Sequence, residues 1–329
     1  MRILAITATR DVSPSPAIAS QLSALERLGV EVDRLSIPSG AASSYIRAAA
    51  QVMIGALRHG RRYDVIHGFY GHCGAVARAQ LGIPVVVTFQ GSDLLGGTER
   101  EPLFRRDGII GRTVARFADA VIVMTEEMKR ASGRADALVL PFGVDTELFR
   151  PRDQAAARAE LGLSTTGRLV LFPWHPDRPE KNHSLAAEAV RLLRDAGEDV
   201  KLLTIHGRPP REVALHMNAC DALVLVSSHE GSPVAVREAL ACGLPVVSVD
   251  VGDVAEVIAG AHGCRLVDRA ADAVAEGLRQ AFRAGRSEDG AARMAKLDVA
   301  WAAKEVLRVY QGLSTKRRGT LGLLTSRDG

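Results

Sequence analysis

The sequence predicts an α/β protein built on parallel sheets that helices cover on both faces. Short apolar runs rich in Val, Ile and Leu alternate with longer amphipathic stretches along the chain, and such runs are typical of buried parallel strands. The alternation restarts after residue 150 of 329, and this length suits two domains. We therefore expect two Rossmann-like, doubly wound domains facing across a cleft, with ligands at the carboxyl ends of the strands.

The first domain is expected to span residues 1–150. Its strands are short, β-branched and bounded by turn residues, and they are predicted at 2–7, 30–35, 65–67, 85–89, 120–124 and 137–140. Helical patterns follow at 17–28 and 45–58. The second helix and the residues just after it form an amphipathic, basic segment. It combines Arg47, Arg58, Arg61 and Arg62 with apolar side chains such as Ile46, Met53, Ile54 and Leu57. That composition fits either a helix packed on its sheet or a basic surface for membrane lipid.

The second domain is expected to span residues 151–298, after a linker within 144–158. Strands are predicted at 169–172, 200–205, 222–226, 245–249 and 264–267. Helices are predicted at 184–196, 211–219, 233–242, 254–259 and 270–283. A C-terminal helix at 299–313 is expected to cross back to the first domain, and residues 314–329 to form a basic, disordered tail.

Composition excludes several classes of protein. With 47% hydrophobic residues and a net charge of +4, the chain is neither disordered nor built like a nucleic-acid binder. Its four cysteines lie far apart and are expected to be reduced core residues. The sequence shows no signal peptide and no apolar stretch of about 18 residues. We expect a cytoplasmic protein with room for weak peripheral contact at the inner face of the membrane.

Missing motifs narrow the chemistry. The chain contains no GxGxxG and no GxxxxGK[ST], which disfavours ordinary dinucleotide oxidoreductases and P-loop NTPases. No Asp-x-Asp occurs either, so a metal-bridged diphosphate has no obvious ligands. We expect neither a cofactor nor a metal.

The most informative segment runs from residue 227 to residue 245. It predicts a strand end, a tight loop and a helix, with Ser232 as N-cap and Pro233 as the first helical residue. The backbone amides of Ser232 and Val234 would then be free at a helix N-terminus, which suits a diphosphate. Two carboxylates, Glu230 and Glu238, bracket this loop.

This segment resembles the family-four glycosyltransferases, whose E-x7-E motif matches Glu230 and Glu238. IHGFYG, TFQGSDL, LPFGVDTELF and RPEKN also fall at the expected places. The resemblance implies a GT-B fold and retaining, metal-independent transfer. It implies that Glu230 contacts the donor sugar, that Glu238 holds the ribose, and that Lys181 neutralises the leaving phosphate. The donor-binding set is then Glu238, Gly231, Ser232, Pro233, Val234, Arg178 and Gln90, with Glu230 and Lys181 catalytic.

Two departures from the family pattern leave alternatives open. Gln90 replaces a His that supports the donor sugar, and Pro176 replaces an Arg for which Arg178 would substitute. We predict a glycosyltransferase that moves a sugar from a nucleotide donor to a saccharide or lipid-linked acceptor, in polysaccharide or glycoconjugate synthesis. The alternatives are a donor-binding protein without transfer and a sugar-nucleotide epimerase on the same scaffold.

Overall fold

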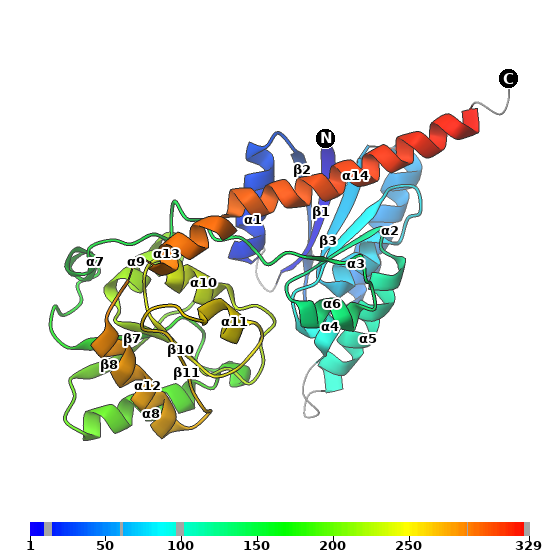
Figure 1. The fold of residues 1–329 in the computed structure, drawn as a ribbon. Coiled ribbons are helices and arrows are strands. Elements are labelled where there is room, and N and C mark those ends of the chain that lie inside the picture. The colour runs from blue at the N-terminus through cyan, green and yellow to red at the C-terminus, as the bar shows by residue number, and fades with distance from the viewer. Residues whose placement is uncertain (10–14, 60–61, 97–101, 288, 326–329) are drawn as a thin grey trace. The chain divides into compact units, whose positions relative to one another are not determined.

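The chain folds into two compact units (Figure 1). The computed structural model describes residues 1–9, 15–59, 62–96, 102–287 and 289–325, without the side chains of 59, 102–105 and 316–325. Unit 1 comprises Met1–Gly143 and Val299–Gly329, and unit 2 comprises Val144–Asp298. The division therefore falls at residue 143 rather than at residue 150, and the C-terminal helix belongs to unit 1.

Unit 1 contains a parallel six-stranded sheet in the order β2-β1-β3-β4-β5-β6. Its strands are β1 (Arg2–Thr9), β2 (Glu31–Pro38), β3 (Val65–Phe69), β4 (Val85–Thr88), β5 (Ala120–Val123) and β6 (Leu138–Val139). Its helices are α1 (Pro16–Arg27), α2 (Ala42–His59), α3 (Gly71–Ala77), α4 (Ser92–Leu95), α5 (Pro102–Phe117), α6 (Glu126–Ser132) and α14 (Val299–Thr325).

Unit 2 contains a parallel five-stranded sheet in the order β11-β10-β9-β7-β8. Its strands are β7 (Arg168–Phe172), β8 (Val200–Thr204), β9 (Ala222–Leu225), β10 (Val246–Ser248) and β11 (Arg265–Leu266). Its helices are α7 (Gln154–Glu160), α8 (His183–Asp195), α9 (Pro210–Ala219), α10 (Val234–Ala241), α11 (Val254–Ile258), α12 (Ala271–Ala284) and α13 (Asp289–Met294), with short 3₁₀ turns η1 (Pro179–Lys181) and η2 (Ala295–Leu297).

Both sheets confirm the α/β fold class, and every strand predicted from the sequence is present. The prediction missed helices α3 to α7 and α13. Helix α5 contains Gly111, where an added Cβ would lie 1.6 Å from the carbonyl oxygen of Asp93. Close backbone approach therefore demands glycine in a helix that propensity disfavours. The linker predicted at 144–158 begins at the boundary between the units but ends earlier than predicted. Helix α7 starts at Gln154, and Asp153 caps it by accepting from the Ala156 amide at 2.7 Å.

The C-terminal helix also differs from prediction, since α14 extends to Thr325 instead of ending at residue 313. Isolated glycines weaken a helix without ending it. No helix within the described residues is long and apolar enough to cross a membrane.

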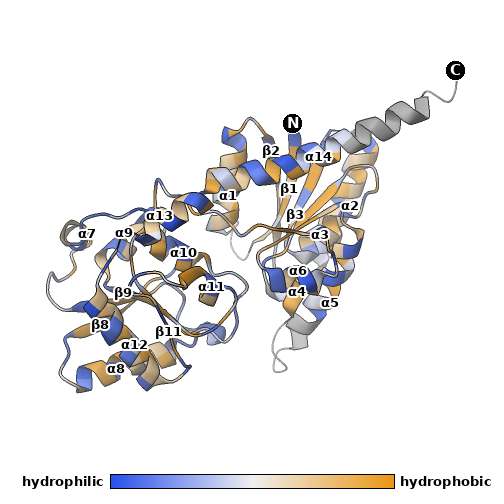
Figure 2. Ribbon diagram, in the orientation of Figure 1, coloured by the Kyte–Doolittle hydropathy of each residue, from blue (hydrophilic) through white to orange (hydrophobic). Residues whose placement is uncertain are grey.

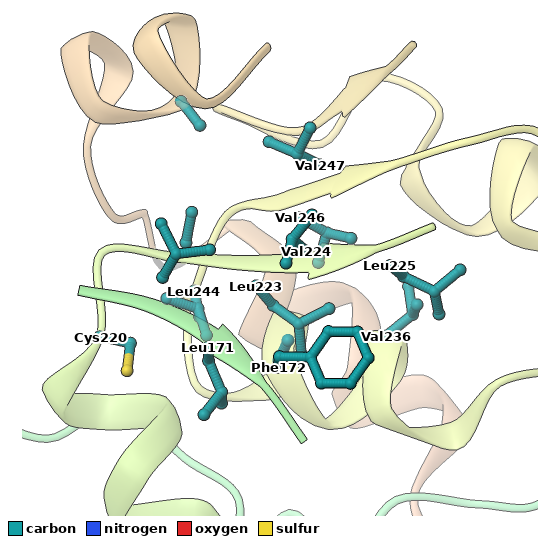
Figure 3. Close-up of a cluster of buried hydrophobic side chains, with 14 of the residues drawn as sticks. Leu171, Phe172, Cys220, Leu223, Val224, Leu225, Val236, Leu244, Val246 and Val247 are labelled. Atoms are coloured by element: carbon teal, nitrogen blue, oxygen red, sulfur yellow. The ribbon is translucent and has the colours of Figure 1, made fainter. Parts of the chain in front are cut away.

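Apolar strands form the interior of each unit, as the colouring by hydropathy shows (Figure 2). In unit 2, side chains of β7, β9 and β10 pack with Val236 of α10 (Figure 3). All four cysteines are buried and free, which confirms them as core residues. This packed core fixes the strand ends from which the functional loops emerge.

A buried histidine ties α14 to the sheet of unit 1. His67 on β3 lies with Nδ1 2.6 Å from the Tyr310 hydroxyl and Nε2 2.7 Å from the Thr88 hydroxyl. Burial lowers the pKa of His67 to about 3, so the ring is neutral in the folded protein. Tyr310 is the largest fully buried side chain in the described structure, and its hydroxyl needs this partner.

His67 should make the stability of unit 1 depend on pH. The unfolded histidine takes up a proton below pH ~6.5, whereas the folded one stays neutral to about pH 3. Stability is therefore present above pH ~6.5 and is lost as the pH falls below it. In His67→Gln, the deficit in unfolding free energy relative to wild type should shrink by about 1.4 kcal/mol per pH unit below that value. Urea unfolding at several pH values measures this, and a constant deficit would contradict it.

Candidate functional site

The strand order of unit 2 marks where a ligand would bind. Strand β7 lies between the two strands that follow it in the sequence, with β8 on one side and β9 on the other. Loops that leave the carboxyl ends of such neighbours separate and create a crevice at this switch point. The loop after β7 carries Lys181, and the loop after β9 carries Glu230.

Lys181 and Glu230 form an ion pair across this switch point. The Nζ of Lys181 donates to Oε1 of Glu230, and the Ser227 hydroxyl donates to the same oxygen at 2.7 Å. Both charged side chains are largely buried, 6% and 13% exposed. None of the described contacts reaches Oε2 of Glu230, which leaves that oxygen able to accept from a ligand hydroxyl.

The ammonium group of Lys181 is buried between Glu230 and the ring of Trp174. Burial lowers the pKa of Lys181, although Glu230 opposes that shift. Its Nζ also lies 4.9 Å from the ring centroid of Trp174, a distance that allows a cation–π contact. The Arg178 guanidinium bonds to Glu180, with Nε 2.6 Å from Oε1. Arg178 is therefore near Lys181 in the chain, but its described contacts do not include the Lys181–Glu230 pair.

Backbone bonds hold the two loops together. The Ser228 amide donates to the Glu180 carbonyl at 2.8 Å, and the Asn182 amide group donates to the Val226 carbonyl at 3.0 Å. Arg269 also donates to the Ser227 carbonyl at 2.7 Å. Hydrogen bonds between the two loops thus hold Lys181 and Glu230 in position, as preorganised sites require.

The start of α10 corrects the predicted cap. The helix begins at Val234 with Pro233 as the capping residue, and the Ser232 side chain makes no capping bond. Instead, the Ser232 hydroxyl accepts from Nη1 of Arg237 at 2.6 Å, because a buried cation lies one turn into the helix. None of the described hydrogen bonds starts from the amides of Gly231 or Ser232. These amides and the first amides of α10 are available to an anion.

Arg237 links this loop to the next one, and sequence reasoning missed it. Nη2 of Arg237 donates to Oδ2 of Asp253, and both side chains are buried. An added Cβ on Gly252, which has φ +58°, would lie 2.5 Å from the Gly231 carbonyl oxygen. The Asp253 loop thus packs directly on the Gly231 loop. In the sequence, Arg237 stands at an otherwise apolar position of the helix, which indicates a buried charge. Nothing in the sequence indicates that Asp253 is its partner.

Glu238 lies one turn beyond the loop, on the same helix. Burial raises its pKa to about 7, and no hydrogen bond to its carboxyl group occurs among the described contacts. A carboxyl group with this pKa changes charge near neutral pH, which is typical of functional sites. The structure thus brings Lys181, Glu230 and residues 231–234 together, with Glu238 following on α10. Metal-binding clusters of three or more His, Cys, Asp or Glu are absent from the described residues.

Gln90 lies in unit 1, in the loop after β4, where a buried carboxylate orders the backbone. Asp93 accepts from the amides of Gln90, Gly91 and Gly71 at 3.0, 2.8 and 3.0 Å. Burial raises the pKa of Asp93 to about 6, and these amides oppose the shift. The side chain of Gln90 has no described hydrogen bond.

A second cluster in unit 1 was not predicted. Tyr70 has a positive φ of 89°, a strained conformation that often marks functional sites. Its hydroxyl lies 3.1 Å from the Ser92 hydroxyl and 3.4 Å from Asp107. The His72 ring lies against Tyr45 and Tyr70 and 3.5 Å from Asp107. Aromatic faces and hydrogen-bonding groups in such proximity suit a hydroxylated ligand.

Comparison with known proteins identifies a family for each half of the chain. Residues 2–139 match the family "Glycosyl transferase 4-like domain", and residues 177–283 match "Glycosyl transferases group 1". A D-inositol 3-phosphate glycosyltransferase of Acidothermus cellulolyticus is 27% identical over 85% of this chain and 74% of its own. The chain spans between 53% and 74% of the length of the curated relatives it matches.

Solved structures share the fold. A sucrose-phosphate synthase from Thermosynechococcus elongatus has a TM-score of 0.79 at 18% identity, over 96% of this chain and all of its own. The Anabaena protein HepE, in complex with UDP-glucose, has a TM-score of 0.72 at 18% identity, over 95% of this chain and all of its own.

The Asp253 contact predicts a selective loss of anion binding. Asp253→Asn should weaken binding of inorganic pyrophosphate by about tenfold or more, since the Arg237 anchor of the loop is lost. Asp221→Asn is the matched control, because Asp221 forms another buried ion pair of unit 2, with Arg158 at 2.7 Å. Both variants should lose stability. Calorimetry with pyrophosphate separates them, and equal affinity in the two variants would contradict the assignment.

Proposed function

We propose that this chain, which belongs to the family-four glycosyltransferases of the GT-B fold, transfers a sugar from a nucleoside diphosphate to an acceptor hydroxyl with retention of anomeric configuration. The observation that carries the proposal is the Lys181–Glu230 pair beside the free amides at the start of α10. These groups provide positive charge for a diphosphate and a carboxylate for sugar hydroxyls within one preorganised crevice.

The diphosphate binds at the loop before α10. The amides of Gly231, Ser232 and Val234 donate to phosphate oxygens, and Lys181 adds a full positive charge. These groups stabilise the leaving diphosphate without a divalent cation. Because Lys181 is buried, its attraction for the developing phosphate charge is weakly screened. Arg178 reaches the same phosphates only by exchanging its bond to Glu180.

The carboxylates orient the rest of the donor. Glu230 accepts from sugar hydroxyls through Oε2, while Lys181 and Ser227 hold Oε1. Glu238 accepts from the ribose hydroxyls. HepE, which shares this fold, is in complex with UDP-glucose, and that supports a uridine nucleotide as the first donor to test.

Retention follows from attack on the face that the diphosphate leaves. The bond between the anomeric carbon and the phosphate oxygen breaks, and the acceptor oxygen forms its bond on the same side. The acceptor proton passes to the departing phosphate. Lys181 and the α10 amides contribute most when this charge develops, so they raise the rate rather than ground-state affinity alone.

The acceptor binds at the Tyr70 cluster of unit 1. Its stacked rings and Asp107 suit a saccharide. The adjoining helix α2 exposes Ile46, Met53 and Leu57 and carries no acidic residue. These features support an acceptor in polysaccharide or glycoconjugate synthesis, including a lipid-linked one, and weak contact of α2 with an anionic bilayer. Arg61 of this basic segment lies outside the described residues.

Metal-free calorimetry with nucleoside diphosphates and their sugars tests the donor site. With chelator present, UDP-glucose should bind wild type more tightly at pH 8 than at pH 6. The cause is Glu238, whose pKa is about 7, because hydroxyl donors favour the ionised carboxylate. Glu238→Gln should bind more weakly and lose this pH dependence.

Lys181→Ala completes the test and should reduce turnover by about 10²–10³-fold. Donor binding without transfer in wild type would identify a binding protein, and conversion of donor without acceptor would identify an epimerase. Normal turnover in Lys181→Ala would contradict the mechanism.

Membrane contact is tested by sedimentation with phosphatidylglycerol vesicles. Leu57→Glu places a carboxylate on a position of α2 that is 79% exposed and should lower vesicle binding about tenfold at low salt. Leu81→Glu is the control, since Leu81 is 88% exposed outside α2. Equal vesicle binding by both variants would contradict the proposal that α2 contacts the membrane.

A further inference from the structure

A cavity in unit 1 is not used by the proposed reaction. It has a volume of about 680 Å³ and lies where α2 meets the first three strands. We name it the α2 cavity; its apolar lining consists of Leu4, Val32, Leu35, Val52, Ile66 and Ile83. Leu4 and Ile66 stand near the starts of β1 and β3. The cavity is therefore at the opposite end of the sheet from Tyr70 and Gln90, which follow strand carboxyl ends.

Small residues on α2 leave this cavity open. Gly55 and Ala56 both line it, and a Cβ built on Gly55 would meet nothing within 4 Å. Glycine lowers the stability of a helix, and no close contact at this position requires it. Dry cavities engineered into proteins are much smaller, roughly 150 Å³. A cavity of this size falls within the range of about 300–1,000 Å³ that is typical of ligand sites.

The mouth of the α2 cavity is polar, with two arginines and one aspartate in its lining. Arg34, Arg62 and Tyr63 line it together with Asp33. Asp33 already accepts from Tyr63 at 2.7 Å and from Arg2 at 2.9 Å, so its charge is compensated. The guanidinium groups of Arg34 and Arg62 pair with Glu26 at 2.8 Å and with Asp33 at 3.6 Å, yet they remain 41% and 48% exposed. Because a guanidinium group has five N–H donors, each retains donors for a second anion. An apolar interior behind exposed guanidinium groups matches an amphiphile with an anionic head.

The helix that forms one wall of the cavity also indicates where this amphiphile comes from. The outer side of α2 exposes Ile46, Met53 and Leu57, and its charged groups include Arg47 and Arg58 but no carboxylate. Such a helix lies in the interface of an anionic bilayer. The same helix therefore carries the exposed apolar residues and one wall of the cavity.

We infer that the α2 cavity binds an acyl chain of an anionic bilayer phospholipid, with the phosphate held at Arg34 and Arg62. This site is separate from the donor and acceptor sites and does not require sugar transfer. Its occupant would anchor unit 1 to the membrane through one inserted chain, in addition to the surface contact of α2.

The test is calorimetric titration of the full chain with palmitoyl lysophosphatidylglycerol below its micelle threshold. Wild type should bind one molecule, and Gly55→Leu, which fills the cavity, should bind at least about tenfold more weakly. Gly312→Leu is the matched control, because Gly312 lies in helix α14 and also has open space around it. Binding as tight in Gly55→Leu as in Gly312→Leu would overturn the inference, as would no binding to wild type.

Two further arms make the result specific. Val52→Trp fills the cavity from one turn earlier on the same face of α2 and should reproduce the loss if Gly55→Leu fails to fold. Farnesyl phosphate offers the same phosphate on an isoprenoid chain, and tighter binding of it than of the lysolipid would overturn the bilayer source in favour of a lipid-linked acceptor. UDP-glucose titration of the same samples reports unit 2 independently, so loss of the donor site and loss of the lipid site are distinguishable.

Discussion

The arrangement of the donor site depends on a buried ion pair between loops of neighbouring strands. Lys181 follows β7 and Glu230 follows β9, and these strands pair in the middle of the unit 2 sheet. Removing either partner would leave an uncompensated buried charge, which is strongly destabilising. The pair is therefore sustained by its surroundings: Ser227, Trp174 and the backbone bonds between the two loops. A diphosphate bound as proposed would compete with Glu230 for a cation already fixed in place.

A second buried pair supports the first without touching it. Arg237 joins Ser232 to Asp253, and Gly252 allows the two loops to approach within contact distance. Nε of Arg237 and Oδ1 of Asp253 remain buried without hydrogen-bond partners in the described structure. Retaining such groups in a core costs free energy. The cost is understandable where a loop must present its amides at fixed positions, because small displacements weaken electrostatic stabilisation.

The sequence predicted the strands, the two-domain organisation and the association of Lys181 with residues 230–234, because each rests on local pattern or motif. It could not predict the Arg237–Asp253 pair, since partners sixteen residues apart are chosen by how two loops fold back. Ser232 was misassigned as a cap for the same reason: a buried guanidinium competes for its hydroxyl. Helix α5 was missed because Gly108 and Gly111 argue locally against a helix, while tight packing on α4 requires them.

The two units share the order of their first three strands, but their functional loops bury groups of opposite charge. In unit 1, as in unit 2, the second strand lies on one side of the first and the third on the other. In unit 1 the loops after β3 and β4 hold a buried carboxylate, Asp93, whose charge the backbone amides stabilise. In unit 2 the loops after β7 and β9 hold a buried ammonium group, and the amides of Gly231 and Ser232 make none of the described hydrogen bonds. Loops whose amides are already engaged suit neutral hydroxyls, whereas loops with free amides and a cation suit phosphate. This difference supports the proposed placement of the donor in unit 2 and of the acceptor in unit 1.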